Sequence, residues 1–424
     1  MPTVWNQAQV VFRHGARSPF QDSPDNPRIW TSDLRAKAAR LSSTFQLVDY
    51  SSGAHLPLSH ALGGSAGAAD RSITEAKTLG GGLNCGMLTQ PGFEQALDLG
   101  GKLRKHYVDT GFVPSVAAQG DVLLRSSLTA RTMETLLGCV SGMWPNEVEN
   151  LENHPVVVGK KGMGSKHTDW INVSIDSCPR LMELFKVGVS QWNGETMPEN
   201  VEAFMKKCRE TTELQQTSGD ALKYGVIAWR DWTSCRLGTG LPLQPGVTMD
   251  IFNQLDQFAA QQAASWFMGG LERSEGDRTE TLRLAHGRTL GEVVERMSDK
   301  ARGHGPKLVL YSAHDWTVMP LLMMLSDPSD PTPWPSFCSD LRIELLRDRS
   351  PAGSPEHYVR VFYCHGTHGK GRPWGESQSV SIAGDKGGRL VPLAKFCDLV
   401  KAFVPTDIDQ ECDCQGMPTK KRDF

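Results

Sequence analysis

No stretch of the chain holds about 18 consecutive apolar residues, the length that a membrane-spanning helix requires, so we expect no transmembrane segment. Charge of one sign is also scarce, because the net charge is −3, and no overall field attracts nucleic acid or an anionic membrane. None of the 10 cysteines stands in a CxxC pair, which argues against a structural zinc site. We therefore expect no metal and no nucleic-acid partner, and an anionic ligand would need a local cluster of cationic side chains.

The N-terminal residues 1–8 contain no basic and apolar leader, so we expect the chain as written to be cytoplasmic. The alternative is the trimmed mature form of an organellar or secreted protein. The cysteines are scattered singly along 424 residues, which argues against a dense disulfide framework but leaves the formation of a few disulfides an open question. The content of 39% hydrophobic and 22% charged residues is typical of a globular protein with a sizeable core.

Short apolar runs at 8–12, 121–124 and 307–311 predict buried strands, and helical patterns follow closely at 129–140 and 316–325. A strand, a turn and a helix form the unit of a parallel sheet, whose ligands bind beyond the carboxyl ends of the strands. Further strands are expected at 341–346 and 358–363, and further helices at 89–107, 201–208, 251–266, 290–297 and 391–403.

The order of these elements predicts an α/β fold with a mainly parallel central sheet flanked by helices. We expect its core to span 1–144 and 301–405, and residues 145–300 to form a smaller, mainly helical insertion that acts as a lid. Residues 20–84 have little periodicity and many Ser, Gly and Pro, which predicts a long connecting loop. Residues 406–424 are expected to form a poorly ordered tail.

The segment Val10–Pro19 holds the first candidate site residues, because Arg13 and Arg17 bracket His14 directly after a strand. The planar guanidinium group of arginine fits phosphate oxygens two at a time. A neutral imidazole is a good nucleophile that can carry a phosphoryl group covalently. An ordinary basic turn is the alternative for Arg-His-Gly alone, but Arg17 and Pro19 at these offsets favour a phosphate site.

Two further strand ends add candidates: Arg125 ends the second strand, and His314 with Asp315 follows the third. Taken alone, Arg125 fits a salt-bridged strand end, and the His-Asp pair fits a hydrogen-bonded turn. Together with the first segment, these turns supply the groups that hydrolysis of a phosphomonoester needs. Arg131 is expected to be structural, because its spacing places it on the flank of a helix.

Each candidate has an expected role in that chemistry. We expect His14 to be the nucleophile, with Asp315 donating a proton to the leaving oxygen and later taking one from water. Because this role asks for a partly protonated carboxyl group, we expect better activity at acid pH. The expected substrate phosphate-binding residues are Arg13, Arg17, Arg125 and His314.

The string RHGARSP resembles the RHGxRxP signature of the histidine acid phosphatases. The string RSSLTART, which begins at Arg125, is similar to that family's Arg-Ser-Thr followed by a second Arg-Thr, and His314-Asp315 matches its His-Asp pair. The resemblance implies an α/β sheet domain with a smaller helical domain, and neither a metal nor an organic cofactor. HDWTVMPLLMML, WPSFCSDLRIEL and VRVFYCHG resemble the lysophosphatidic acid phosphatase branch, which implies a lysophospholipid phosphate as the substrate.

Two other functions stay open. One is a phosphotransferase similar to phosphoglycerate mutase, which shares the Arg-His-Gly arrangement, although the His314-Asp315 pair and the helical insertion argue against it. The other is a phosphate- or lipid-binding protein without turnover, against which the presence of every candidate catalytic residue argues. The residues alone do not give the oligomeric state.

Overall fold

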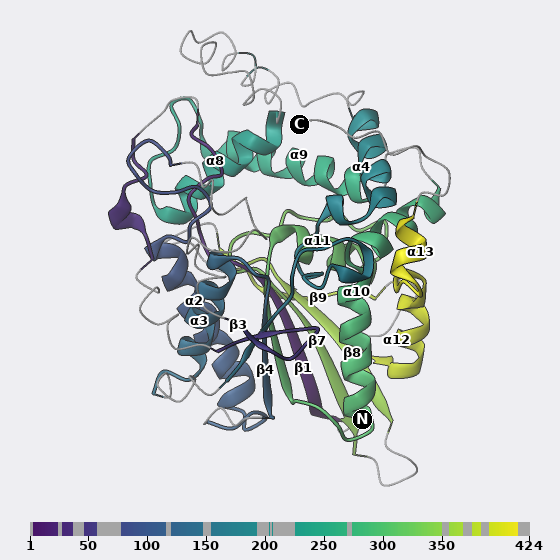
Figure 1. Ribbon diagram of the computed structural model, residues 1–424. Coiled ribbons are helices and arrows are strands. Elements are labelled where there is room, and N and C mark those ends of the chain that lie inside the picture. Colours follow the sequence, from purple (N-terminus) through teal and green to yellow (C-terminus); the bar gives the residue numbers. More distant parts are fainter. Residues whose placement is uncertain are drawn as a thin grey trace.

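The computed structural model describes residues 3–23, 28–36, 46–56, 78–115, 120–146, 154–192, 203, 206, 225–268, 274–349, 356–367, 375–382 and 390–413. The strands, labelled as in Figure 1, are β1 (Thr3–Arg13), β2 (Leu47–Asp49), β3 (His55–Leu56), β4 (Val122–Ser126), β5 (Val156–Val158), β6 (Leu308–Ala313), β7 (Asp340–Asp348), β8 (His357–Cys364), β9 (Ser377–Ser379) and β10 (Val391–Pro392). The α-helices are α2 (Gln90–Leu103), α3 (Ala130–Met143), α4 (Pro179–Trp192), α8 (Gly225–Thr239), α9 (Met249–Phe267), α10 (Glu275–Ala301), α11 (Asp315–Leu325), α12 (Leu393–Val400) and α13 (Ile408–Cys412).

The described strands form one ten-stranded sheet in the order β10-β8-β7-β1-β6-β4-β5-β2-β3, with β9 beside β8. The neighbouring strands β1, β6, β4, β5 and β2 run parallel, and antiparallel strands extend the sheet at both sides. The expected α/β fold with a parallel central sheet is confirmed. Because the carboxyl ends of parallel strands share one edge, the loops after β1, β4 and β6 all lie at that edge.

Helices cover both faces of the sheet, α2 and α3 on one side and α10 and α12 on the other (Figure 1). Successive residues of a strand point to opposite faces, so Val10 and Phe12 of β1 pack with α2 and α3, whereas Val11 packs with the opposite core. Burial on both faces explains why these strands are apolar without alternation.

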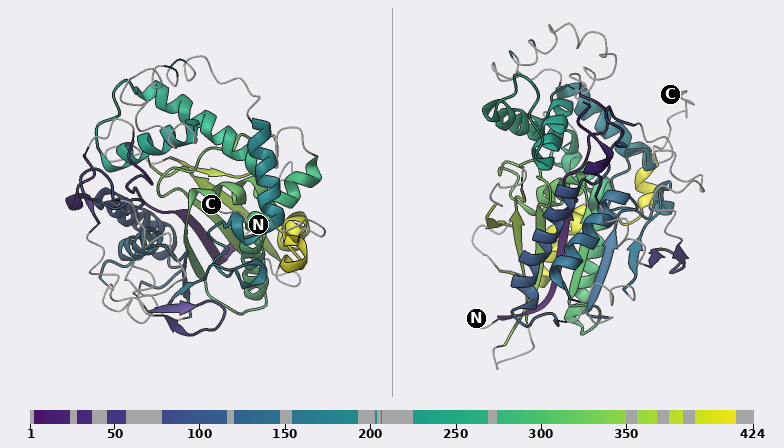
Figure 2. Two further views of the ribbon diagram at one scale, coloured as in Figure 1. Left: turned by 45° about the horizontal axis from the view of Figure 1, so that its top comes forward. Right: turned by 90° about the vertical axis from the view of Figure 1, so that its left-hand side faces the viewer.

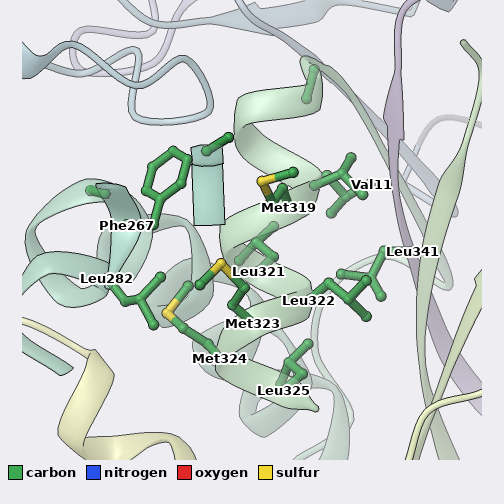
Figure 3. Packing of buried hydrophobic residues seen from close by; sticks show 14 of the residues in the cluster. Val11, Phe267, Leu282, Met319, Leu321, Leu322, Met323, Met324, Leu325 and Leu341 are labelled. Atoms are coloured by element: carbon green, nitrogen blue, oxygen red, sulfur yellow. The ribbon is translucent and has the colours of Figure 1, made fainter. Parts of the chain in front are cut away.

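Helix α11 lies inside the hydrophobic core on the α10 face of the sheet. Val11 and Leu341 from the strands flank it on one side, and Phe267 and Leu282 from α9 and α10 flank it on the other (Figure 3). Its residues 317–325 are all buried, which confirms the buried helix predicted from a run that is apolar nearly all round. No helix within the described ranges, α11 included, is both long and apolar enough to cross a membrane. The start of α11 carries the His-Asp pair to the sheet edge.

The helix starts expected at Thr89 and Thr129 are also confirmed. Thr89 caps α2, where its side chain accepts a hydrogen bond from the amide of Gly92 at 3.3 Å. Thr129 precedes α3 in an extended conformation. The two helices pack against each other, and α3 follows β4 directly, as a parallel sheet requires.

Helices α4, α8 and α9 lie beyond the carboxyl ends of the parallel strands, whereas α10 runs along the sheet (Figures 1 and 2). The Nε2 atom of Gln9 in β1 donates to the carbonyl of Val293 in α10 at 2.8 Å. Strand β5 pairs with β4 and β2. Strand β5 is therefore part of the sheet and α10 packs along it, although both lie within 145–300; the boundaries expected for the insertion stay a prediction.

The structure also differs from the predicted loop at 20–84 and from the predicted helix at 391–403. Strands β2 and β3 fall within 20–84, where the sequence predicts only a connecting loop, and β2 joins the sheet by parallel pairing with β5. The helix expected at 391–403 is shortened by β10 at its start and by a 3₁₀ turn, Lys401–Phe403, at its end. The helix expected at 201–208 lies largely outside the described residues.

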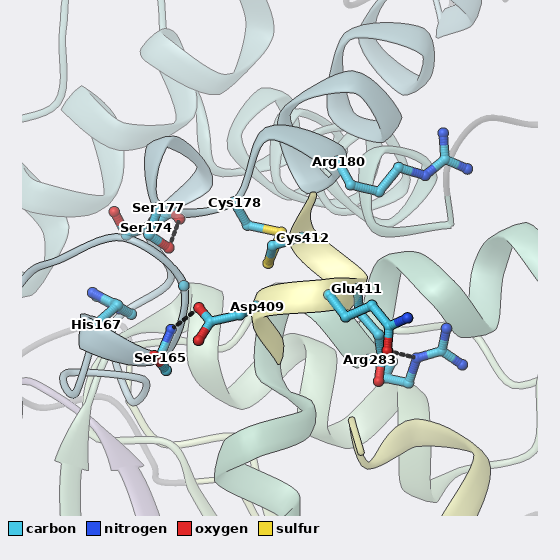
Figure 4. Close-up of a disulfide and its surroundings, with 12 residues drawn as sticks. Ser165, His167, Ser174, Ser177, Cys178, Arg180, Arg283, Asp409, Glu411 and Cys412 are labelled. Carbon is cyan, nitrogen blue, oxygen red and sulfur yellow. Dashed lines mark hydrogen bonds and ion pairs between the residues drawn. A yellow bond between two sulfur atoms is a disulfide. The ribbon is translucent and has the colours of Figure 1, made fainter. Parts of the chain in front are cut away.

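The segment 406–413 is ordered, so the prediction of a tail from 406 onward is wrong there. A disulfide joins Cys178, directly before α4, to Cys412 at the end of α13 (Figure 4). Asp409 accepts a hydrogen bond from the amide of Ser165 at 2.7 Å. These contacts fix the last helix to the start of α4, and sequence spacing alone could not identify the pair of cysteines.

Candidate active site

The loop after β1 is pressed against the first turn of α2. A Cβ atom at Gly15 would lie 2.1 Å from the carbonyl oxygen of Gly92, so no side chain fits at that position. The amide of Gly15 donates to Oγ1 of Thr135 in α3 at 3.0 Å. Backbone contact with two helices therefore fixes where the residues on either side of Gly15 lie.

His14 is buried, with 1% of its surface exposed, and the loop sets its tautomer. Its Nδ1 lies 2.8 Å from the carbonyl oxygen of Gly15, and because a carbonyl only accepts, Nδ1 carries the hydrogen. The lone pair of the ring is then on Nε2. Burial, together with the charges of Arg131 and Arg13, holds the pKa of His14 well below its ordinary value, so the imidazole is neutral.

Arg13 is enclosed by three groups at the end of β1. Its Nη1 donates to the carbonyl of Pro335 at 2.8 Å, its Nη2 lies 2.9 Å from Oδ2 of Asp315, and its guanidinium carbon is 4.2 Å from the ring centre of Phe337. Burial lowers the pKa of Arg13 to about 10, which leaves the side chain charged at neutral pH. The cation is thus held in one position.

Arg17 is held by a residue of α8. Its Nη2 lies 2.8 Å from Oδ1 of Asp231, and its guanidinium carbon is 3.8 Å from the ring centre of Phe20. Burial opposes the charge, but Asp231 outweighs it and raises the pKa of Arg17 above its ordinary value. Phe20 is 54% exposed, so an aromatic ring lies on the guanidinium group and also faces solvent.

His314, at the start of α11, is brought to His14 by the pairing of β1 with β6, and their ring centres are 5.6 Å apart. Its Nδ1 lies 3.2 Å from Nη2 of Arg131, and its Nε2 lies 2.8 Å from Oγ of Ser127. Burial and the charge of Arg131 hold the pKa of His314 well below its ordinary value.

The structure therefore places Arg131 among the candidate site residues, and the expectation that it only flanks a helix is wrong. Besides contacting His314, its guanidinium carbon lies 5.4 Å from the ring centre of Phe20. Burial, followed by the charge of Arg17, lowers the pKa of Arg131 to about 9. Because Arg131 is in the first turn of α3, its side chain reaches back to the edge where β1 and β6 end.

Arg125 has different neighbours from those expected. Its Nε lies 2.9 Å from Oε1 of Glu292 in α10, and its guanidinium carbon is 4.1 Å from the ring centre of Tyr50 and 5.1 Å from that of Trp170. Arg125 is a residue within β4, so its side chain points to the α10 face of the sheet rather than past the strand end. The alternative interpretation of this residue, a salt-bridged strand residue, matches the geometry.

Asp315 is bound to its surroundings through both carboxylate oxygens. Oδ2 accepts a hydrogen bond from Nε1 of Trp334 at 2.9 Å and lies next to Arg13, and Oδ1 accepts from the amide of Trp316 at 2.9 Å. Burial favours the neutral acid, but the charges of Arg13 and Arg17 outweigh burial and lower the pKa of Asp315 to about 2. The carboxyl group of the free protein is thus ionised, contrary to the partly protonated group expected.

The geometry groups five of the six expected site residues with one that was not expected. The expected residues brought together are Arg13, His14, Arg17, His314 and Asp315, and the added residue is Arg131. Buried cations around a neutral imidazole can hold an anion and present it to a nucleophile. Within the part of the chain that the structure describes, no three His, Cys, Asp or Glu side chains are placed to hold a metal ion.

The chain is similar to known proteins over most of its length. The chain is 28% identical over 407 residues to "Lysophosphatidic acid phosphatase type 6" of Bos taurus, covering 93% of this chain and 82% of that protein. It is 26% identical over 345 residues to "Lysosomal acid phosphatase" of Bos taurus, covering 78% of this chain and 74% of that protein.

The fold is similar to that of the solved phytase of Hafnia alvei in complex with tartrate, with a TM-score of 0.62 at 14% identity, covering 97% of this chain and 99% of that one. The model of the histidine phosphatase superfamily (branch 2) matches residues 5–364. Since that match spans most of the chain and includes every candidate site residue, the chain belongs to branch 2 of the histidine phosphatase superfamily.

Proposed function

We propose that this chain hydrolyses phosphomonoesters through a phosphohistidine formed on His14. Membership of the family gives the reaction class, that of a phosphoric monoester hydrolase. The environment of His14 carries the mechanistic part of the proposal. Nδ1 is bound to the loop, which leaves the Nε2 lone pair, and burial together with nearby guanidinium charges lowers the pKa of the ring and keeps it neutral. These are the conditions under which an imidazole attacks a bound phosphoryl group.

In the first step, Nε2 of His14 forms a bond to phosphorus while the bond from phosphorus to the ester oxygen breaks. The electron pair of that bond stays on the ester oxygen, which takes a proton from Asp315 and leaves as an alcohol. In the second step, water attacks the phosphohistidine, gives a proton to Asp315, and releases phosphate and the neutral imidazole. Arg13, Arg17 and Arg131 stabilise the charge on the phosphoryl oxygens throughout.

The proposal replaces Arg125 by Arg131 as the third arginine of the phosphate pocket. Arg131 lies 3.2 Å from His314 and lowers the pKa of His14, whereas Arg125 is paired with Glu292. His314 remains the fourth phosphate-binding residue of the proposal.

The proton on Asp315 has to arrive with the substrate, because the pKa of this carboxyl group is about 2 in the free protein. A phosphate monoester loses its second proton at about pH 6, so its monoanion is abundant in acid. The negative charge of bound phosphate also offsets the arginine charges that lower the pKa of Asp315. Activity should therefore be higher at acid pH, as expected, but for a different reason.

As substrate class we propose esters whose alcohol carries a large apolar group, such as the acyl chain of lysophospholipid phosphates. The exposed ring of Phe20 on Arg17 supports this class, because it offers apolar surface beside a phosphate-binding cation. The similarity to lysophosphatidic acid phosphatases of type 6 points in the same direction. The contact between Asp231 and Arg17 supports a lid role for α8. The cytoplasmic location expected from the sequence stays a prediction.

The decisive experiment traps the intermediate. Brief incubation with a ³²P-labelled phosphomonoester and quenching in alkali, in which phosphohistidine survives, should label the wild-type protein and leave His14→Ala unlabelled. Equal labelling of the two proteins, or hydrolysis by His14→Ala at the wild-type rate, would contradict the proposal. A panel of lysophosphatidic acid, phytate, sugar phosphates and phosphotyrosine then tests the substrate class.

The same preparations separate the two remaining alternatives. A phosphotransferase similar to phosphoglycerate mutase would transfer the label to an acceptor when a bisphosphate primer is supplied, whereas a hydrolase releases it as inorganic phosphate. A binding protein without turnover would retain the ester unchanged.

A further inference from the structure

The two oxygens of the Asp315 carboxylate have different surroundings. Oδ2 accepts a hydrogen bond from the indole Nε1 of Trp334 at 2.9 Å, and Nη2 of Arg13 lies 2.9 Å from the same oxygen. Oδ1 accepts a hydrogen bond from the amide of Trp316 at 2.9 Å. The side chain of Asp315 keeps 15% of its surface exposed, so the carboxylate is not sealed off.

This difference decides which oxygen carries a proton. An indole N–H and a guanidinium group are donors only, so neither accepts a proton held on Oδ2, and the cation beside Oδ2 opposes protonation there. A carboxylate oxygen has two lone pairs. Within the described part of the chain, one lone pair of Oδ1 accepts the hydrogen bond from the amide of Trp316. The second lone pair of Oδ1 is the place for the catalytic proton.

We infer that Trp334 is a positioning residue, which holds Oδ2 of Asp315 so that Oδ1 faces the leaving oxygen and delivers the proton; the inference rests on the proposed function. In that step the proton moves from Oδ1 to the ester oxygen as the phosphorus–oxygen bond breaks and its electron pair stays on that oxygen. Trp334 exchanges no proton and touches no reacting atom.

A contact with Arg230 of α8 fixes the position of Trp334. Trp334 is 4% exposed, and the guanidinium carbon of Arg230 lies 4.4 Å from the centre of one of its rings. Arg230 is paired with Asp256 of α9, whose Oδ1 lies 2.8 Å from its Nε. A chain of contacts thus runs from α9 through α8 and Trp334 to Asp315.

The segment 334–337 also holds the cation beside the same carboxylate. The carbonyl of Pro335 accepts from Nη1 of Arg13, and the ring of Phe337 lies against its guanidinium group. One short segment therefore supports both members of the pair formed by Arg13 and Asp315. Correct orientation of the carboxylate depends on the indole N–H, which is the single donor of that segment to Asp315 among the described contacts.

The test uses Trp334→Phe, which keeps an aromatic ring and removes the N–H group. General-acid assistance matters for an alkyl ester, whose alkoxide leaves poorly, and hardly for 4-nitrophenyl phosphate, whose phenolate leaves without a proton. We expect kcat/KM to fall about tenfold or more for 2-glycerol phosphate and less than about threefold for the aryl ester. A merely structural role would lower both values by the same factor, which would overturn the inference.

The ratio of the two rates does not depend on the folded fraction, because one preparation is assayed with both esters. Trp144→Phe is the matched control, since Trp144 is 1% exposed and its Nε1 donates to the carbonyl of Pro114 at 3.1 Å. The control should leave the ratio within about twofold of wild type.

A double variant supplies the second readout. Asp315→Asn should already change the ratio of the two rates, and adding Trp334→Phe should change it no further, because the two residues act on one proton. A further change of tenfold in the double variant would overturn the inference. Failure of the wild-type protein to hydrolyse either ester would instead contradict the proposed function itself.

Discussion

Arg131 and His314 form a donor–acceptor pair in which Nη2 of the arginine lies 3.2 Å from Nδ1 of the imidazole. Because arginine only donates, Nδ1 accepts, and the ring hydrogen is on Nε2, which lies 2.8 Å from Oγ of Ser127. The pair joins the first turn of α3 to the start of α11, which are 183 residues apart in the sequence. A phosphate group entering the site would be bound beside both side chains.

The first prediction separates Arg131 from Arg125. Removing a preorganised cation from a phosphate site weakens transition-state binding, so Arg131→Ala should lower kcat/KM by about a hundredfold or more and raise the inhibition constant of inorganic phosphate. Arg125→Ala should leave kcat/KM per folded molecule within about threefold of wild type. It should instead reduce the free energy of unfolding by about 1–3 kcal/mol, because the buried Glu292 loses one of its two arginine partners and keeps Arg296. The opposite pattern would restore Arg125 to the phosphate site.

The second prediction concerns pH. The pKa of His14 is lowered by burial and by Arg131, so the nucleophile stays neutral below the pH at which an ordinary histidine is protonated. The pKa of Asp315, about 2, keeps that carboxyl ionised in the free protein over the assay range. We therefore expect kcat/KM to hold well below pH 6.5 and to decline on the alkaline side as the ester loses its second proton, at about pH 6.

That alkaline decline should move with the substrate. Aryl esters of acidic phenols lose their second proton at lower pH than alkyl esters, so profiles measured with the two kinds of ester should be displaced in that direction. Coincident profiles would show that a group of the protein, rather than the ester, sets the decline.

The third prediction is about substrate choice at Phe20. Replacing this exposed ring by alanine removes apolar surface beside Arg17, which should weaken binding of an ester with an apolar alcohol by about tenfold. The KM for 2-glycerol phosphate should change much less. Met163→Ala is the control, because Met163 is also 54% exposed. If Phe20→Ala changed both KM values equally, the ring would serve to hold Arg17 rather than to select the substrate.

The fourth prediction concerns the disulfide. Cys178 and Cys412 are 234 residues apart, so their bond restricts a long loop of the unfolded chain. The double variant Cys178→Ser, Cys412→Ser should lose about 2–4 kcal/mol of unfolding free energy, measured by urea denaturation under oxidising conditions. Reducing agent should bring the wild-type protein to the stability of the variant. Equal stability of both proteins before reduction would show that the bond contributes nothing.

The local pattern of apolar and polar residues is sufficient to predict most strands and helices of the fold. The apolar runs that became β1, β4, β6 and α11 are short and bounded by polar residues, so period and length alone identify them. The candidate residues His14 and Asp315 lie just beyond the ends of β1 and β6, where the same pattern predicts them. Strand β5, within 145–300, could not be predicted because its three residues are too few for a periodic signal.

Arg125 and Arg131 show where that reasoning ends. The strand continues to Ser126, one residue beyond Arg125, so a side chain expected past the strand end lies on its face. The second Arg-Thr of RSSLTART, which contains Arg131, is the feature of the sequence that points to the arginine proposed here. Asp231 lies 214 residues from Arg17 and Trp334 lies 19 residues from Asp315, so no local pattern links either pair before folding brings it together.

Gly15 and Gly92 fit against each other, since a Cβ atom at Gly92 would also lie 2.0 Å from the carbonyl oxygen of Ala16. The loop that bears His14 is therefore seated on α2 before any ester arrives, and no binding energy is diverted to ordering it. Phe20 and α8, which contact Arg17, are attached to the site through side chains instead. Engineering of a new substrate specificity should therefore begin with Phe20 and α8 and leave His14 and its loop unchanged.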